Sequence, residues 1–519
     1  MVLHLVSYCE AKGRKTLNVP DNCFTTNKRS NKKSLSMKTK FNSTEVNAQA
    51  YFKLKGQKLL NIDDGGGLLS NLGGLPLMSR LAEDTGMAEK VAGRVPEWRN
   101  EAFITFSKEE LLTQRLFLAA SGNSDAIDCS LSRDDPALKS VLGKEPDGLA
   151  LASQSTHTRL EQAIDETTVK ELEGFFLDFF FDQHKQAPRK LAVAIDGSGI
   201  RTYGAQQGST YRGGKKAQEQ YFPLVATTDS GWLLLSQLRY GRVSDANAVP
   251  IIKDLVLRIK SEWPNTVLTL RIDTGFNSPE LLEFLDKEGI GYECGYPCTD
   301  GVRAMCDDVF AEVEKEFCHL YGRPKFVGSK GKEKFQREHN RIRALPAEKR
   351  MVAEKELDSR RVRRVVEIMY RGSSWDKERR VIVRADFSDS GLDVRSVVTS
   401  HKYGIPKSIY EDGYCKRARV EMFIKENKSQ CRVPLSCQEY TSNQFRFVLQ
   451  GLAYQLLHML RLKQSAAESN ISVAGIRNTL LLVPVLIVPT HRRLYWHLSS
   501  VHPNTAKVIQ MAKKLQKAA

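Results

Sequence analysis

The sequence predicts an α/β protein in which helices precede a mixed sheet that is itself flanked by helices. Two observations predict the sheet. Apolar runs rich in β-branched residues, Leu191–Ile195 and Val267–Ile272, are each ended by turn-forming residues, as buried strands are. Between them, Val249–Ile259 has the apolar spacing of a helix, and strands alternating with helices are typical of an α/β core.

Composition and charge restrict the partners. The 519 residues carry a formal net charge of +17, and the excess lies at both ends. Twelve Lys and Arg face three Asp and Glu in residues 1–60, and eighteen face six in residues 401–519. Nucleic acid fits this distribution, although a solvated basic surface has the same composition. The longest apolar run, residues 479–489, is too short to cross a bilayer, so we expect no membrane partner.

The periodicity of the chain predicts five regions. At the start of the chain, apolar residues follow neither the strand period nor the helix period. Helical spacing comes next, and after it strand-like and helix-like segments alternate. The expected regions are a basic disordered arm in 1–60, a helical DNA-binding region in 61–185, the first part of the core in 186–300, a helical and β-rich insertion in 301–400, and the second part of the core, ending in a basic helix, in 401–519.

Two helices are predicted within the helical region. Ser107 and Glu110 have the spacing of a capping box and precede an apolar helical pattern. A second helix is expected to begin near Ser153 or Ser155. Its outward side chains would be polar and suited to reading DNA, namely Gln154, His157 and Arg159. A plain amphipathic helix with a solvated face explains the same pattern.

An aspartate ends each of the two predicted strands. Asp196 is followed by glycine and serine, and Asp273 by threonine and glycine. A carboxylate at the end of a buried strand costs desolvation unless a cation or hydrogen bonds satisfy it, and glycine lets a ligand approach the backbone. Strand ends are also where chemistry collects in open α/β sheets. Either aspartate alone is explained as a turn cap, but the pair favours a metal site.

A third acidic residue lies in a basic helical stretch. At helical spacing, Tyr414, Arg417, Glu421 and Lys428 share one face. Glu421 offers a hard carboxylate, Arg417 and Lys428 can hold phosphates, and Tyr414 can bond or stack. A solvated helix face would explain the stretch if it stood alone.

The spacing Tyr414-x-x-Arg417-x-x-x-Glu421, with Lys428 after it, resembles the Tyr-Arg-Glu-Lys signature of bacterial insertion-sequence DDE transposases. These belong to the transposase DDE domain group, which has an RNase H-like core. Further agreement lies in residues 125–138, 151–161, 203–206, 271–276 and 289–292. The resemblance therefore extends over residues 60–510.

The resemblance implies a catalytic triad of Asp196, Asp273 and Glu421 that binds two Mg²⁺ ions, with Mn²⁺ as an alternative. Such an enzyme cleaves DNA at the ends of its element and transfers the 3′-hydroxyl into target DNA. Its implied partners are double-stranded DNA, carrying terminal inverted repeats or the target site, and a second copy of the chain. The implied location is the bacterial cytoplasm, in association with the nucleoid.

The resemblance also accounts for the 148 residues between Asp273 and Glu421, because related hairpin-forming transposases carry a β-rich insertion there. Trp375, at the tip of a predicted hairpin, would stack on a flipped base, unless it is buried in the hairpin itself. Gly208–Lys216 lacks the register of a Walker A loop, so we expect no nucleotide cofactor. A nuclease that does not transpose and an inactive DNA-binding repressor remain alternatives.

Overall fold

The computed structural model of the chain describes residues 50–53, 59–62, 64–213, 218–357, 359–465 and 470–517. The chain forms two compact units, Met1–Gly65 and Gly66–Ala519. The predicted disordered arm, residues 1–60, lies mostly outside the described residues. Where the first unit is described, it contains an antiparallel pair of strands, β1 (Ala50–Lys53) and β2 (Leu59–Ile62).

After the short strand β3 (Leu69–Ser70), the second unit continues with helices. The capping box is confirmed: the Glu110 N–H donates to Ser107 Oγ over 3.0 Å, and the Ser107 N–H donates to the Glu110 carboxylate over 2.7 Å. This start removes two unpaired donors from the first turn. The helices of this region are α1 (Leu75–Thr85), α2 (Met87–Gly93), η1 (Glu101–Phe103), α3 (Lys108–Ser121), α4 (Ala126–Leu131), α5 (Pro136–Val141), α6 (Gln154–Ala163) and α7 (Glu166–Asp182).

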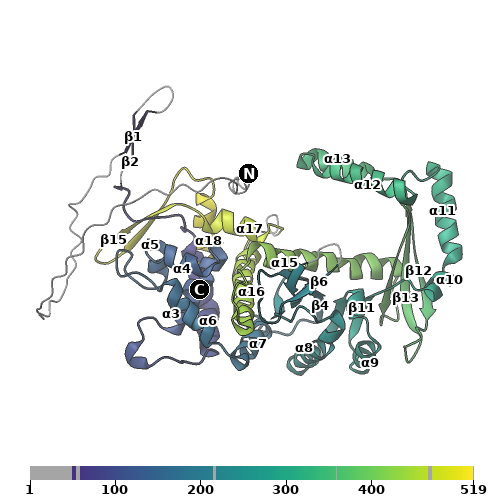
Figure 1. The fold of residues 1–519 in the computed structure, drawn as a ribbon, viewed down its shortest axis with the longest axis horizontal. Helices are drawn as coiled ribbons and strands as arrows, with labels where there is room; N and C mark the ends of the chain where they lie inside the picture. Colours follow the sequence, from purple (N-terminus) through teal and green to yellow (C-terminus); the bar gives the residue numbers. More distant parts are fainter. Residues whose placement is uncertain are drawn as a thin grey trace, which may run out of the picture. The chain divides into compact units, whose positions relative to one another are not determined.

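A mixed eight-stranded sheet follows, in the order β12-β13-β14-β11-β10-β4-β8-β9 (Figure 1). Strands β4, β10 and β11 are parallel, whereas β8 and β9 are antiparallel to their neighbours. This arrangement confirms the predicted α/β class, with a mixed sheet flanked by helices. Its elements are β4 (Lys190–Gly197), β8 (Leu224–Thr228), β9 (Leu233–Gln237), η2 (Asp245–Ala248), α8 (Val249–Glu262), β10 (Val267–Ile272), η3 (Thr274–Phe276), α9 (Pro279–Lys287) and β11 (Gly291–Tyr296).

The predicted insertion shares this sheet. Its last strand, β14, pairs antiparallel with β11, so the three insertion strands extend the core sheet at one edge. The insertion consists of α10 (Asp300–Ala304), α11 (Asp307–Tyr321), α12 (Gly328–Arg343), α13 (Ala347–Leu357), β12 (Arg361–Tyr370), β13 (Arg379–Ser388) and β14 (Gly391–Thr399).

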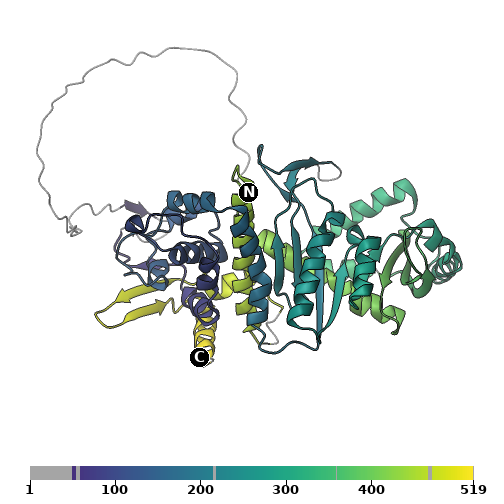
Figure 2. The same ribbon diagram turned by 90° about the horizontal axis from the view of Figure 1, so that it is seen from below.

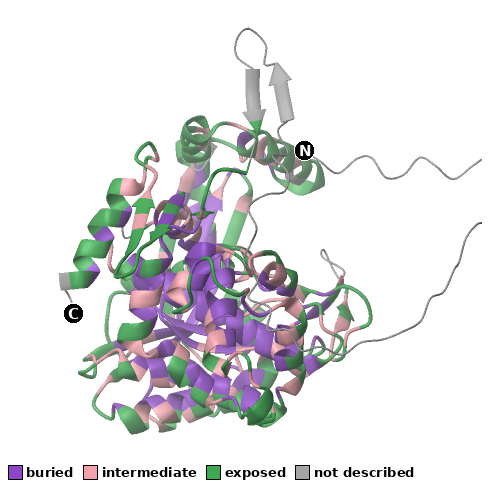
Figure 3. Ribbon diagram, turned by 90° about the vertical axis from the view of Figure 1, so that its left-hand side faces the viewer, coloured by how far each residue is buried: buried purple, intermediate pink, exposed green. Residues whose placement is uncertain are grey.

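The C-terminal part returns to the core and then to the helical region. Helix α16 is almost wholly buried, its polar side chains included, because α3, α7 and β9 all pack against it (Figure 2). Buried positions gather on the sheet and the helices next to it, and outer helix faces are exposed (Figure 3). The elements are α14 (Pro406–Ser408), η4 (Ile409–Gly413), η5 (Tyr414–Lys416), α15 (Arg417–Gln430), α16 (Tyr440–Leu462), α17 (Val473–Ile476), η7 (Arg477–Leu481), β15 (Val485–Pro489), β16 (Leu494–Leu498) and α18 (Thr505–Lys517).

Two three-stranded sheets are also present. One has the order β5-β7-β6, formed by β5 (Ile200–Arg201), β6 (Thr210–Arg212) and β7 (Gln218–Tyr221). The other has the order β16-β15-β3, in which β3 (Leu69–Ser70) comes from the start of the unit. Within the described ranges, no helix has both the length and the apolar character needed to cross a bilayer.

Candidate active site

Two neighbouring strands bring Asp196 and Asp273 to the same edge of the sheet. Strands β4 and β10 are parallel, and Ile195 pairs with Ile272 in their register. Asp196 lies near the end of β4, and Asp273 caps η3 directly after β10. Because the two aspartates follow paired residues, they emerge side by side at the carboxyl ends of their strands.

Helix α15 supplies Glu421 from above this edge. Val420, Phe423 and Ile424 are buried and fix the helix against the core, where it packs on β4 and β8. Glu421 lies on the other side and its side chain is 49% exposed. The predicted polar face is therefore present, except that Tyr414 lies in the short 3₁₀ turn η5 before the helix begins.

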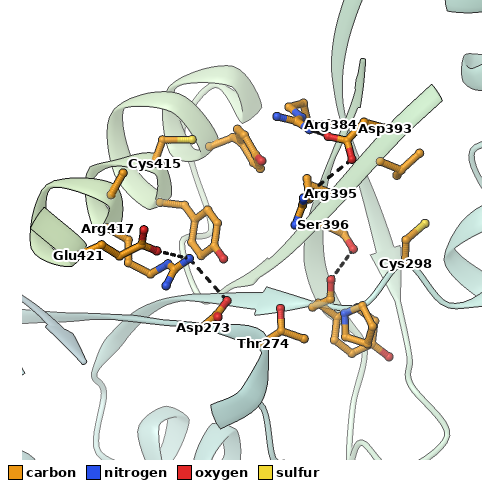
Figure 4. A pocket seen from close by; sticks show the side chains of 16 residues that line it. Asp273, Thr274, Cys298, Arg384, Asp393, Arg395, Ser396, Cys415, Arg417 and Glu421 are labelled. Atoms are coloured by element: carbon orange, nitrogen blue, oxygen red, sulfur yellow. Dashed lines mark hydrogen bonds and ion pairs between the residues drawn. The ribbon is translucent and has the colours of Figure 1, made fainter. Parts of the chain in front are cut away.

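Arg417 joins two of the three carboxylates (Figure 4). Its Nη2 lies 2.9 Å from Glu421 Oε1 and 3.6 Å from Asp273 Oδ1. The guanidinium also lies over the Tyr414 ring, 5.5 Å from its centroid. One cation thus balances two acidic side chains that come from positions 148 residues apart in the sequence.

Asp196 belongs to the same electrostatic unit. Burial raises the pKa of Asp196 to about 6, while Arg417 and Lys428 act to lower it and the charges of Glu421 and Asp273 act to raise it. A carboxylate responds to charges this way only when they are close. The pKa of Asp196 is therefore sensitive to both of the other predicted acidic residues.

Lys428 approaches Asp196 from the opposite side. Its ammonium donates a hydrogen bond to the backbone carbonyl of Ser198, two residues beyond Asp196. Burial lowers the pKa of Lys428 to about 7, and Asp196 acts to raise it. The Lys428 ammonium therefore points to the turn after β4. The predicted phosphate contact would instead require it to face solvent.

An open cavity of about 610 Å³ lies beside these residues (Figure 4). Asp273, Arg417 and Glu421 line one side of it, and Arg384 and Arg395 of the insertion line the other. The sequence analysis did not single out these two arginines. The only signal for them was the basic character of residues 301–400, where 23 Lys and Arg exceed 17 Asp and Glu by six.

The three carboxylates suit a hard divalent cation in chemical type, since Mg²⁺ prefers carboxylate oxygens. As they stand, no group of three or more His, Cys, Asp or Glu side chains in the described ranges is placed to hold one ion. In this arrangement Arg417 is the ion-pair partner of both Glu421 and Asp273. The Asp273 and Glu421 side chains are each about half exposed and line the open cavity.

Comparison with known proteins decides the family. A family model described as transposase DDE domain group 1 matches residues 52–519. The chain belongs to this family of DDE transposases. It is therefore an enzyme of DNA transposition that cleaves and transfers DNA strands, and the family generally uses divalent metal ions.

Other comparisons add little to this assignment. No curated protein sequence matches the chain significantly. Among solved structures, the cryo-electron microscopy structure of a piggyBac transposase synaptic complex with hairpin DNA is similar over 78% of this chain and 79% of that chain. The sequence identity is 11% and the TM-score is 0.39.

The transposase has a fourth carboxylate beside the site that the sequence analysis missed. Asp245 begins η2 and lies against the backbone turns that follow both aspartates: a Cβ added to Gly197 would lie 2.4 Å from its Oδ1, and one added to Gly275 would lie 2.5 Å from its Oδ2. Arg239 is its ion-pair partner at 3.6 Å. Burial raises the pKa of Asp245, and Arg239 acts to lower it. Nothing in the sequence around Asp245 distinguishes it from a helix cap.

Trp375 is not available to a DNA base in this structure. Its side chain is 4% exposed, and its ring contacts Tyr296 at a centroid distance of 4.8 Å and the Arg379 guanidinium at 5.7 Å. The prediction of base stacking is therefore wrong for this conformation. Trp375 is buried at the end of its hairpin, where Tyr296 at the end of β11 packs against its ring.

The predicted DNA-reading helix, α6, is also placed differently. His157 is 1% exposed, and burial, assisted by the charge of Arg115, lowers its pKa to about 3. Gln154 is partly exposed, and only Arg159 faces solvent fully. Helices α4 and α16 pack against α6, which leaves little of it free. The outward orientation predicted for His157 is therefore wrong.

Proposed function

We propose that Asp196, Asp273 and Glu421 are the catalytic triad of this DDE transposase and hold two Mg²⁺ ions, which Mn²⁺ can replace. The observation that carries the proposal is the shared charge environment of the three side chains, with Arg417 between two of them. When bound, the ions would activate a water or 3′-hydroxyl and stabilise the leaving oxygen of an in-line phosphoryl transfer.

The cations around the triad would position the DNA strand. A phosphate entering the cavity offers Arg417 a new partner, so that Glu421 and Asp273 are released to bind metal. Arg384 and Arg395 would hold the same strand from the insertion side. Tyr414, whose pKa burial raises to about 12, stays protonated and can donate a hydrogen bond. Lys428 would keep the turn after Asp196 in place through the Ser198 carbonyl.

The reaction would begin with hydrolysis at an end of the element, within a terminal inverted repeat. The freed 3′-hydroxyl would then attack an opposing or target strand. Two ends must be held together for this, which is the reason to expect a homodimer on DNA. The expected setting is the nucleoid of a bacterial cell.

Carboxamide substitutions test the triad. With a labelled duplex that carries the element end and Mg²⁺, the Asp273→Asn and Glu421→Gln variants are each expected to cleave at least about a hundredfold more slowly, because metal-based charge stabilisation contributes several kcal/mol. DNA affinity should be retained. Asp254→Asn, which changes an exposed carboxylate on α8, is the matched control and should cleave normally. Full activity in the Asp273 or Glu421 variant would refute the assignment.

A further inference from the structure

The end of the chain has an unusual charge composition. From residue 469 onward there is no Asp or Glu, although this segment has seven basic residues: Arg477, Arg492, Arg493, Lys507, Lys513, Lys514 and Lys517. The triad and its cavity use none of them. Arg477 is held by the Ala120 and Gln430 carbonyls, and the uncompensated positive charge of the remainder attracts a polyanion.

The strands β15 and β16 of this segment form a hairpin that is anchored on one face. Val485 and Ile487 are each 1% exposed, and the Trp496 indole donates a hydrogen bond to the Gly73 carbonyl over 2.8 Å. The tip is closed by two hydrogen bonds from Thr490, through its N–H and its hydroxyl, to the Arg493 carbonyl. The hairpin therefore has a fixed orientation on the helical region. In Figure 2 its two yellow arrows extend away from the neighbouring helices.

The opposite face of the hairpin is uncovered in the described structure. Leu486 pairs with His497 and Val488 with Tyr495, so these four side chains share that face, and all are exposed. The Tyr495 and His497 rings are stacked, with centroids 5.9 Å apart and planes 3° apart. This face combines apolar groups with flat rings.

The positive charge of the β15–β16 hairpin lies at its tip. Arg492 and Arg493 are adjacent and exposed, and neither forms an ion pair with a described residue. In the insertion, by contrast, the exposed Arg341 and Arg364 pair with Glu338 and Glu316. Two unpaired guanidinium groups at a rigid tip can bind phosphates without first giving up a protein partner.

We propose that the β15–β16 hairpin docks on duplex DNA, with Arg492 and Arg493 on the phosphates and the Tyr495 face along a groove. A two-stranded ribbon fits the major groove, where apolar side chains can contact thymine methyl groups. A second copy of the chain is a poorer occupant, because the tips of both copies are basic and would repel each other. The inference rests on the chain acting on DNA but not on which residues form the triad.

Salt-dependent binding tests the proposal. The full chain is titrated against a short labelled duplex of mixed sequence, in EDTA so that no cleavage occurs. For Arg492→Ala/Arg493→Ala, the affinity should fall roughly tenfold or more, and the slope of log K against log salt should decrease by about 2, one for each lost phosphate contact. Arg492→Lys/Arg493→Lys should retain most of the slope. The control variant Lys170→Ala/Lys185→Ala also removes two positive charges, from one exposed side chain on α7 and one just after it. It should leave the slope unchanged.

Three outcomes would overturn the proposal. One is an unchanged slope in the Arg492→Ala/Arg493→Ala variant. Another is an equal loss in the Lys170→Ala/Lys185→Ala control, which would indicate a general charge effect. The third is a change in oligomeric state, measured by light scattering, while each protomer still binds DNA normally, because the hairpin would then contact a second copy. Wild-type protein that binds no duplex would instead contradict the DNA function itself, which distinguishes that failure from this one.

Discussion

Arg417 determines the charge balance of the active site at the scale of single residues. It lies between Glu421 and Asp273, and its charge also acts on Asp196. A cation in this position competes with a metal ion for the same oxygens, yet it is also suited to hold a phosphate. The side chain would therefore alternate between two partners during the reaction.

Removing this cation should separate its two roles. In the Arg417→Gln variant we expect Mn²⁺ to bind several-fold more tightly to the DNA-free protein, because the carboxylates lose their competing partner. Cleavage should nevertheless slow by about tenfold or more, since a phosphate contact is lost. Calorimetric titration with Mn²⁺ and a cleavage assay measure the two effects. Weaker Mn²⁺ binding would mean that Arg417 does not compete for the metal ligands.

Close packing around the aspartate turns makes a second prediction. Gly197→Ala places a methyl group 2.4 Å from Asp245 Oδ1, so the end of β4 must shift and cleavage should fall. Asp245→Ala in the same chain removes the obstructing oxygen and should restore part of the rate. Gly93→Ala, where nothing lies within 4 Å, is the control. If the double variant is no faster than Gly197→Ala, contact with Asp245 is not the cause.

A buried ionic cluster links three elements, α3, α6 and α16. Glu161 lies 2.7 Å from Arg446 and 3.5 Å from Arg115, and all three side chains are at most 6% exposed. Glu161→Gln would leave two buried guanidinium groups without a counter-charge, which should lower the free energy of unfolding by about 3–5 kcal/mol. Urea denaturation measures this. In the control variant Glu171→Gln, which changes an exposed side chain on α7, the free energy of unfolding should change by less than about 0.5 kcal/mol. An equally small effect for Glu161→Gln would show that the buried ionic cluster does not stabilise the fold.

His157 on α6 should make stability depend on pH. Its pKa is about 3 when folded and 6.5 by its ordinary value. Above pH 6.5 both states are neutral and nothing is lost; below it, only the unfolded chain takes up a proton. The wild type should therefore lose about 2 kcal/mol between pH 7.5 and pH 5, relative to His157→Leu. A constant difference between the two proteins over this range would show that His157 is accessible to protons when folded.

The sequence predicts best those helices and strands whose apolar pattern depends only on burial in the core. The strands at Leu191–Ile195 and Val267–Ile272 and the helix at Val249–Ile259 are present because their apolar side chains have few alternatives to a core. The orientation of His157 was wrong because α4 and α16 pack against α6 and leave this side chain buried. Helix α16 lies almost 300 residues later in the chain. Trp375 was misplaced for the same reason: its cover comes from Tyr296 on another strand.

At the scale of the whole molecule, three segments separated by 77 and 148 residues meet at one site. The Tyr-Arg-Glu-Lys spacing and the two strand-end aspartates are the sequence signals on which the proposed triad rests. The walls of the site were not predictable, because Arg384, Arg395 and Asp245 reach it only through tertiary packing. The pairing of β15 with β3, across more than 400 residues, likewise has no local signal.

The central claim is that Asp196, Asp273 and Glu421 jointly bind the catalytic metal ions. Anomalous scattering from Mn²⁺ in crystals of the protein with cleaved-end DNA tests it most directly. The account predicts metal peaks within about 2.2 Å of oxygens from all three side chains, with Arg417 turned from Glu421 and Asp273 to a phosphate. Metal peaks that leave out Glu421, or that lie away from this edge of the sheet, would contradict it.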